Sequence, residues 1–450
     1  MSLEQREKIK KQILLGNYVE AEREFYRAKQ TEATNEWQSF LTEVAESDEA
    51  RAIARTLKET YGYRVMRKRA VPIVTLTGDR IAIPSWYALK LGKKKGKAKK
   101  GPNGRGDHLL LRYWGFMGKQ SLNYASRLAR QGVSCQSYDL AAQECRAQGV
   151  SVSAPSVNNA TQTFGDIALA HRDRIALVPE ETFNNKRIIV AIDGGRVRTR
   201  EKKPGRYAKD QKRAQFTTAW REPKLLVIAE LDEQGKYRKG TKPIYEATMN
   251  NHDEVFYLLY QLARGTHLNE AKEIILSGDG AQWIWEKFSW LSNNLGITGK
   301  TTEILDFYHA TEHLTAIAEA NTALSARERA AWFQTLKTLL RAGRFEDLKT
   351  SIEKESQTKR VPALMNLFQY FERNRDRIRY DVYEKNHQPI GSGIVESAVR
   401  RVINLKLKSP SIFWNIHNLE RVLHLRCILM AGRWNIMVNN MLKVIQLKTR

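Results

Sequence analysis

The sequence predicts a mixed α/β protein, in which a sheet-containing domain is flanked by helical segments. Two apolar, β-branched runs carry the sheet signal, and each ends in Asp-Gly: RIIVAIDGG and EIILSGDGA. Long stretches before and after them place apolar residues three and four positions apart, which is the spacing of helices that bury one face. Strands followed by helices favour a central sheet covered by helices. With 450 residues the chain is too long for one simple core, and several domains are expected.

The first two segments in chain order are helical and then strand-containing. Residues 1–62 are expected to be helices, and residues 63–118 a small strand-containing region. In the latter, VPIVTLTGDRIAIP predicts a hairpin that turns near Gly78 and Asp79. A basic loop, LGKKKGKAKKGPNGR, follows and is either a solvated linker or an arm that contacts DNA phosphates. Its candidate phosphate contacts are Lys93, Lys94 and Lys95.

Residues 119–180 predict three helices joined by short turns. Gly132 is expected to end the first helix, Ser137 or Asp139 to cap the second, and Gly149 to stop it. This is the spacing of a helix-turn-helix DNA-binding unit, although an ordinary three-helix bundle has the same pattern. In the DNA-binding interpretation, the third helix offers polar side chains to base edges, namely Asn158, Asn159 and Gln162.

Residues 181–310 and 386–450 are expected to form the sheet-containing domain, with residues 311–385 as a helical insertion. Two more strands are predicted within FTTAWREPKLLVIAELD, and another in TTEILDFYH, where it leads into a helix. Helical spacing then continues to about residue 385, and sheet character does not return after it.

Three carboxylates are the candidate catalytic and metal-binding residues. Asp193 and Asp279 each end a strand-like run, and reactive groups gather where the strands of an open α/β sheet end. Glu396 follows GSG and is expected about one turn into a helix. Hard oxygen ligands suit Mg²⁺ or Mn²⁺, and two such ions can activate a water molecule and stabilise a leaving oxygen. Asp-Gly alone is also a common turn, so it is the combination that favours a site.

The charge balance indicates a polyanionic partner. The formal net charge is +26, from 75 Lys and Arg against 49 Asp and Glu, and folding requires no such excess. Nucleic acid is the first candidate, because the sequence has neither a basic amphipathic helix nor a lipid motif for a membrane surface. Basic residues close to the carboxylates either contact DNA phosphates or form solvated surfaces: Arg196, Arg198, Arg200, Arg400, Arg401, Lys406 and Lys408.

The sequence also predicts a soluble, cytoplasmic protein with no membrane partner. No segment approaches the length of a membrane-spanning apolar run, and the first residues lack the apolar core of a signal peptide. The three cysteines form no CxxC pair, which fits a reducing compartment and does not favour a cysteine-rich zinc site.

Five blocks of the sequence, in order, resemble the bacterial insertion-sequence transposases of the DDE class, in particular the families related to ISKra and ISLre. The blocks are AIDGGRVRTR, WREPKLLVIAELD, LSGDGAQWIW, LDFYHATEHL and GSGIVESAVRRVINLKLK. The resemblance extends from about residue 120 to 440. Several relatives carry a cysteine-rich element before the helix-turn-helix, and this chain has no matching cysteines there.

The resemblance implies an RNase H-like catalytic domain with a helical insertion before the glutamate. It implies that Asp193, Asp279 and Glu396 are the triad, holding two Mg²⁺ or Mn²⁺ ions. The implied activity is metal-dependent cleavage at transposon ends, followed by strand transfer into target DNA. The implied partners are double-stranded DNA and a second copy of the chain in a synaptic complex, in a protein associated with the nucleoid.

Two other interpretations use some of the same residues. The run HATEH matches the H-x-x-E-H motif of inverted zinc proteases, with His309 and His313 on one helical face. Alternatively Asp306, His309 and His313 border the transposase site, just outside its carboxylates. A catalytically inactive DNA-binding protein derived from a transposase is a further alternative. Three tryptophans after the second aspartate either pack in the core or stack on bases: Trp283, Trp285 and Trp290.

Overall fold

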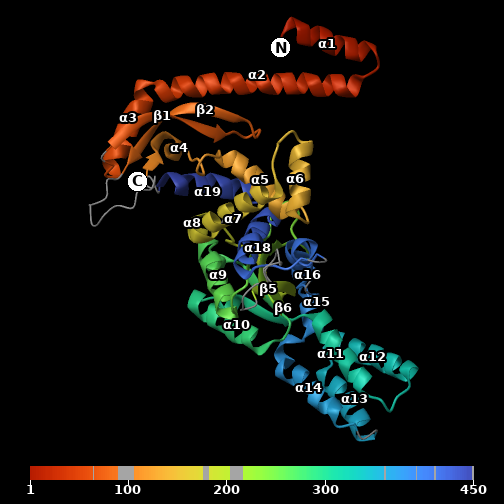
Figure 1. Cartoon of the computed structure of the whole chain (residues 1–450). Helices are drawn as coiled ribbons and strands as arrows, with labels where there is room; N and C mark the ends of the chain where they lie inside the picture. The colour runs from red at the N-terminus through yellow and green to blue at the C-terminus, as the bar shows by residue number, and fades with distance from the viewer. Residues whose placement is uncertain are drawn as a thin grey trace. The chain divides into compact units, whose positions relative to one another are not determined.

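The computed structural model shows a mixed α/β protein. It describes residues 1–63, 65–89, 106–175, 182–202, 216–358, 361–391, 393–409 and 412–447. The chain forms two compact units, Met1–Phe164 with Val438–Arg450 and Gly165–Met437 (Figure 1). The finer division expected from the sequence remains a prediction. No helix within the described residues is long and apolar enough to span a bilayer.

Helices open the first unit, as predicted: α1 (Leu3–Leu14), α2 (Tyr18–Glu46) and α3 (Asp48–Thr60). Serines define two of these helix starts. Ser2 forms a capping box with Gln5 at the start of α1, and the Ser47 hydroxyl accepts a hydrogen bond from the Ala50 N–H at the start of α3. The turn between α2 and α3 is therefore set by local side-chain chemistry.

A three-stranded antiparallel sheet follows, in the order β1-β2-β3, with β1 at Val65–Val74, β2 at Arg80–Leu89 and β3 at Gly106–His108. The predicted hairpin is confirmed, and its strands are longer than the sequence motif indicated. Gly78 lies in the turn with a φ of 88°, a conformation that glycine adopts without strain. The basic loop with Lys93, Lys94 and Lys95 lies outside the described residues.

The three helices predicted after the small sheet are present: α5 (Leu122–Ser134), α6 (Tyr138–Ala147) and α7 (Ala154–Ala170), preceded by the short α4 (Leu109–Tyr113). Ser137 caps α6, and Gly149 follows it with a φ of 82°. The expectation that Gly132 ends α5 was wrong, because the helix continues to Ser134. A Cβ atom on Gly132 would lie 2.1 Å from the Thr161 hydroxyl, so this glycine permits close packing of α5 on α7.

The second unit is built on a five-stranded mixed sheet with the order β10-β9-β4-β7-β8. Strands β4, β7 and β8 form an antiparallel meander, whereas β9 and β10 run parallel to β4 on its other side. Their bounds are β4 Arg187–Gly194, β7 Lys224–Leu231, β8 Ile244–Thr248, β9 Glu273–Gly278 and β10 Thr301–Leu305. A separate ribbon pairs β5 (Val197–Lys202) with β6 (Phe216–Arg221).

Helices cover the sheet on both faces, which is why β4 and β7 are buried along nearly their whole length. α9 (His252–Gly265) packs on β7 and β8, α16 (Gly393–Val399) on β4 and β7, and α18 (Ile416–Met430) on β8. α16 continues through a π-helical turn, Arg400–Asn404, into α17 (Leu405–Leu407). The other helices of this unit are α8 (Arg172–Ile175), α10 (Gln282–Leu295) and the start of α19 (Trp434–Leu447).

The predicted helical segment after β10 is confirmed. It consists of α11 (Phe307–Ala320), α12 (Ala326–Arg341), α13 (Phe345–Thr358), α14 (Ala363–Arg373) and α15 (Tyr380–Lys385). α11 to α14 gather at one end of the second unit (Figure 1). Leu340, Leu348 and Phe368 join the same hydrophobic cluster as the sheet residues Ile188 and Leu276, so the helical segment and the sheet share one core.

Candidate active site

Three aspartates lie at one edge of the five-stranded sheet. β4, β9 and β10 are parallel neighbours, so their carboxyl ends meet at the same edge. Asp193 is the second-last residue of β4, Asp279 directly follows β9, and Asp306 directly follows β10. All three line a cavity of about 10 Å³, together with His309 and Val395. A cavity of this size holds about one water molecule.

Asp193 is electrostatically perturbed in this cavity. Burial raises its pKa above the ordinary aspartate value, and the nearby Asp279 and Asp306 add to the rise. The Gly194 N–H, 2.6 Å from Asp193 Oδ1, and the charge of His309 oppose this rise without cancelling it. The protein surroundings therefore disfavour negative charge on Asp193, and a bound cation would offset that effect.

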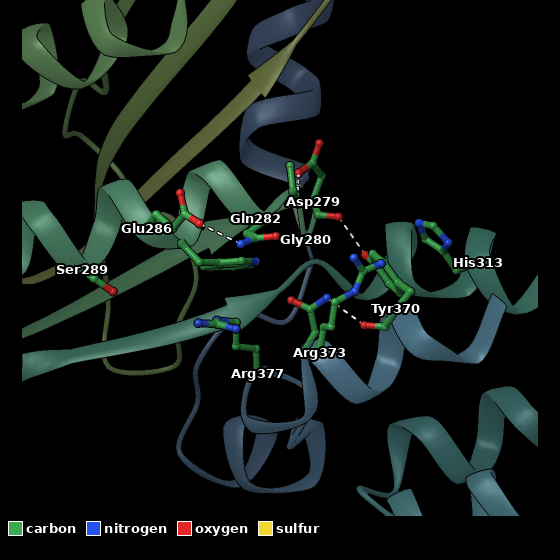
Figure 2. Close-up of a pocket in the computed structure, with 12 residues that line it drawn as sticks. Asp279, Gly280, Gln282, Glu286, Ser289, His313, Tyr370, Arg373 and Arg377 are labelled. Carbon is green, nitrogen blue, oxygen red and sulfur yellow. Dashed lines mark hydrogen bonds between the residues drawn. The ribbon is translucent and has the colours of Figure 1, made fainter. Parts of the chain in front are cut away.

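Asp279 is fixed through both its backbone and its side chain. Its Oδ1 accepts a hydrogen bond of 2.9 Å from the Ala281 N–H, and its carbonyl oxygen accepts one of 2.7 Å from the Tyr370 hydroxyl (Figure 2). Gly280 follows with a φ of 89°. The sequence offered no sign of the Tyr370 contact, because this tyrosine belongs to α14, 91 residues away along the chain.

Asp306 caps α11 and is almost fully buried, with 1% of its surface exposed. Its Oδ1 accepts a hydrogen bond of 2.9 Å from the His309 N–H, and its own N–H donates to the Gly278 carbonyl oxygen at 2.9 Å. Its Oδ2 is buried and has no hydrogen-bond partner within the described part of the chain.

Glu396 belongs to the helix that borders the same cavity. α16 packs on β4 and β7, and Val395 lines the cavity, but the Glu396 side chain is exposed and is not among the lining residues. Across the described residues, no three His, Cys, Asp or Glu side chains form a preformed group that could hold a metal ion as they stand. Two members of the predicted triad thus lie together, and the third lies on an adjacent helix.

A larger cavity, of about 690 Å³, adjoins Asp279 on the side of α14. Figure 2 shows Tyr370, His313 and Arg373 on its walls. The His313 and Tyr370 rings stack with centroids 3.6 Å apart, and the Arg377 guanidinium lies 4.5 Å from the centroid of Trp285. The cavity therefore combines aromatic and cationic groups beside a carboxylate.

The two histidines of HATEH do not converge on one point. His309 lines the small acidic cavity, whereas His313 lines the larger one. Glu312 pairs with His309 Nδ1 at 3.2 Å and its side chain is 74% exposed. This arrangement gives no support to a zinc-protease site.

The basic residues beside the carboxylates differ in accessibility. Arg196, Arg200, Arg400 and Lys408 are exposed, and Arg198 and Arg401 are half-buried. The Arg198 guanidinium lies 4.9 Å from the Phe413 ring centroid, and Arg401 donates a 2.6 Å hydrogen bond to the Tyr245 hydroxyl. Lys406 is only 1% exposed and lies over the Trp414 ring, so its burial argues against the expected phosphate contact.

The candidate base-reading residues of α7 are partly engaged within the protein. Asn159 is exposed, whereas Asn158 and Gln162 are half-buried. Gln162 donates hydrogen bonds to the Tyr138 hydroxyl at 3.1 Å and to Asn158 Oδ1 at 3.4 Å. Of the three tryptophans after Asp279, Trp285 is buried in the core, as the packing interpretation expected, and Trp290 is 45% exposed.

No model of a known protein family matches the chain, and no curated protein matches it.

Proposed function

We propose that this protein is a DNA transposase of the DDE class, with Asp193, Asp279 and Glu396 as its catalytic carboxylates. One observation carries the proposal: Asp193 and Asp279 lie at the carboxyl ends of neighbouring parallel strands and line the same cavity. Catalytic residues in open sheets gather at such an edge. The chain's net charge of +26 fits a DNA substrate.

The sheet order supports an RNase H-like catalytic domain. In that fold an antiparallel three-stranded meander is followed by two strands that run parallel to its first strand, with helices on both faces. β4, β7 and β8 correspond to the meander, and β9 and β10 to the two later strands. The helices α11 to α15 then stand between the last strand and α16, as an insertion before the glutamate.

The reaction we propose begins with hydrolysis of a phosphodiester at the end of the element. Water attacks phosphorus, the bond to the 3′ oxygen breaks, and the freed 3′-OH then attacks a phosphodiester of the target, displacing the target's 3′ oxygen. Two bound Mg²⁺ or Mn²⁺ ions would lower the reaction barrier by stabilising negative charge on both the attacking and the leaving oxygens. Asp193 and Asp279 would hold such ions from the sheet, and Glu396 from α16.

The substrates proposed are the two transposon ends and a target duplex, with two copies of the chain in the synaptic complex. The exposed side chains of Arg196, Arg200, Arg400 and Lys408 stand close in sequence to the carboxylates and would contact phosphates.

A catalytically inactive DNA-binding protein is a second candidate. The exposed Glu396 side chain and the lack of a three-ligand group within the described residues favour it. The two candidates differ in one measurable property, which is strand cleavage.

Cleavage of a duplex that carries the element's flanking inverted repeats, with Mg²⁺, tests the proposal. Asp193→Asn, Asp279→Asn and Glu396→Gln should each abolish cleavage and strand transfer while leaving binding to the ends nearly intact. Because the three residues act as a unit, double variants should be scarcely worse than single ones. Glu319→Gln, which removes an exposed carboxylate from α11, is the matched control and should cleave normally. A wild-type protein that binds the ends but cleaves nothing would favour the inactive alternative.

A further inference from the structure

We propose that Asp306 is a third cation-binding carboxylate at the edge of the sheet, and that its buried Oδ2 atom is the coordinating oxygen. The inference rests on the proposed metal-dependent function, and it adds a ligand to the set Asp193, Asp279 and Glu396. Its basis is the placement of Asp306 and the hydrogen bonding of its two oxygens.

The strand register brings Asp306 to the level of the other two aspartates. Leu305 of β10 pairs with Gly278 of β9, and the Asp306 N–H donates to the Gly278 carbonyl oxygen at 2.9 Å. Asp306 and Asp279 are therefore the first residues after two paired strands. Both line the cavity that Asp193 also lines.

The capping role of Asp306 explains only one of its oxygens. Oδ1 accepts the hydrogen bond from the His309 N–H that starts α11. Asn or Ser caps a helix about as well as Asp, so the cap does not require the second oxygen. Oδ2 is nevertheless buried without a hydrogen-bond partner among the described residues. An unsatisfied buried polar atom costs about 1–3 kcal/mol, and a charged one costs more.

A bound cation would compensate the buried Asp306 Oδ2 better than the nearby protein groups can. The other carboxylates on the cavity, Asp193 and Asp279, repel negative charge on Asp306. His309 also lines the cavity, but its Nδ1 pairs with Glu312 at 3.2 Å. A hard divalent ion prefers carboxylate oxygens, and the cavity has room for about one particle of the size of water.

The proposal predicts that the full-length protein binds Mn²⁺ without DNA, and that Asp306 contributes to the affinity. Mn²⁺ titration followed by electron paramagnetic resonance measures this directly. Asp306→Ser and Asp306→Asn both keep an oxygen for the helix cap and remove the second carboxylate oxygen. Each should weaken Mn²⁺ binding about tenfold or more, because affinity follows the number of charged ligands.

Two control variants distinguish the loss of a metal ligand from the loss of a helix cap and from the loss of a surface charge. Ser325→Ala removes the capping hydroxyl of α12, and Glu319→Gln removes an exposed carboxylate from α11. Both should bind Mn²⁺ as the wild type does. Thermal unfolding gives a second readout: Mn²⁺ should raise the wild-type Tm, and it should raise the Tm of Asp306→Asn much less.

The outcomes distinguish this inference from the proposed function. If the wild type binds no Mn²⁺ at millimolar concentration without DNA, the inference is overturned, whereas the proposed function is decided by the cleavage assay, in which substrate phosphates can complete the metal site. If the wild type binds Mn²⁺ and both Asp306 variants bind it equally well, only the role of Asp306 is overturned, and the residue is a helix cap. Should Asp306→Ser fold poorly, Asp306→Asn decides, since it preserves both the shape and the cap.

Discussion

Replacing Gly280 by alanine tests whether the loop after Asp279 is as tightly enclosed as the structure shows. Gly280 has a φ of 89°, in the left-handed region, where a side chain is disfavoured by about 1–2 kcal/mol. A Cβ atom there would also lie 2.5 Å from the Tyr370 hydroxyl oxygen and 2.8 Å from Leu305 Cδ1. Overpacking of this kind costs about 1–3 kcal/mol. We therefore expect Gly280→Ala to destabilise this loop by roughly 2–5 kcal/mol.

Gly296→Ala provides the matched control. Gly296 also has a positive φ, of 64°, but a Cβ atom on it would meet no atom within 4 Å. Its replacement should bring the backbone strain alone, about 1–2 kcal/mol. Both positions flank α10, so hydrogen exchange of peptides that cover residues 273–296 reports on both variants.

The difference in hydrogen exchange between the two variants isolates the steric cost of a Cβ atom at Gly280. Amide hydrogens in these peptides should exchange faster in Gly280→Ala than in Gly296→Ala. The ratio of the rates should correspond to the additional steric cost at Gly280, about 1–3 kcal/mol. It should also reduce DNA cleavage, since Asp279 precedes the strained residue, whereas Gly296→Ala should not. Equal exchange in the two variants would refute the close contacts to Tyr370 and Leu305.

Two further predictions concern acid stability and DNA recognition. Burial acts to raise the pKa of Glu246, but the Arg172 guanidinium at 2.5 Å and the His424 ring at 3.0 Å outweigh it and hold the pKa at about 2. This carboxylate therefore stabilises the fold above about pH 4.5 by about 3 kcal/mol, and the stabilisation is lost as the pH falls towards 2. Urea unfolding of Glu246→Gln should show lower stability at pH 7 and a flatter dependence between pH 4.5 and 2, and an unchanged dependence would contradict the assignment. Replacing Asn158, Asn159 and Gln162 by alanine should weaken binding to transposon ends more than binding to random DNA, because base contacts specify the sequence. An equal loss of affinity for both DNAs in a binding assay would contradict base reading by this helix.

The strands that carry the two aspartates could be predicted because burial on both faces leaves an unbroken apolar run. RIIVAI and EIILS show this pattern, and each ends where a polar turn begins. β8 was not predicted, because its sequence IYEAT places a glutamate in the middle of a short strand. Glu246 is tolerated there because Arg172, 74 residues away along the chain, neutralises it. A compensation between such distant residues leaves no local signal.

In the candidate site, too, local features could be predicted from the sequence and contacts between distant residues could not. Asp193 and Asp279 were identified from the ends of their own strands, which are local features. The partner of Asp279, Tyr370, comes from a helix of the insertion and meets it only in the folded chain. The buried Oδ2 of Asp306 is likewise a property of packing, since the sequence LDFYH indicates a helix cap and nothing about the second oxygen.

The helix that carries Glu396 shows why its basic residues were hard to assign to a face. GIVESAVRRVINLKLK predicts a regular helix, but residues Arg400–Asn404 form a π-helical turn, which adds about one residue to the turn and rotates the later residues by about 100°. Such a turn releases backbone carbonyls from the regular hydrogen-bond pattern. Here the buried Arg426 of α18 satisfies two of them, donating to the Arg401 and Val402 carbonyl oxygens. The rotation places Lys406 in the core beside Trp414 while Arg400, at the start of the π turn, stays exposed, so Arg400 is a better candidate than Lys406 for contact with DNA.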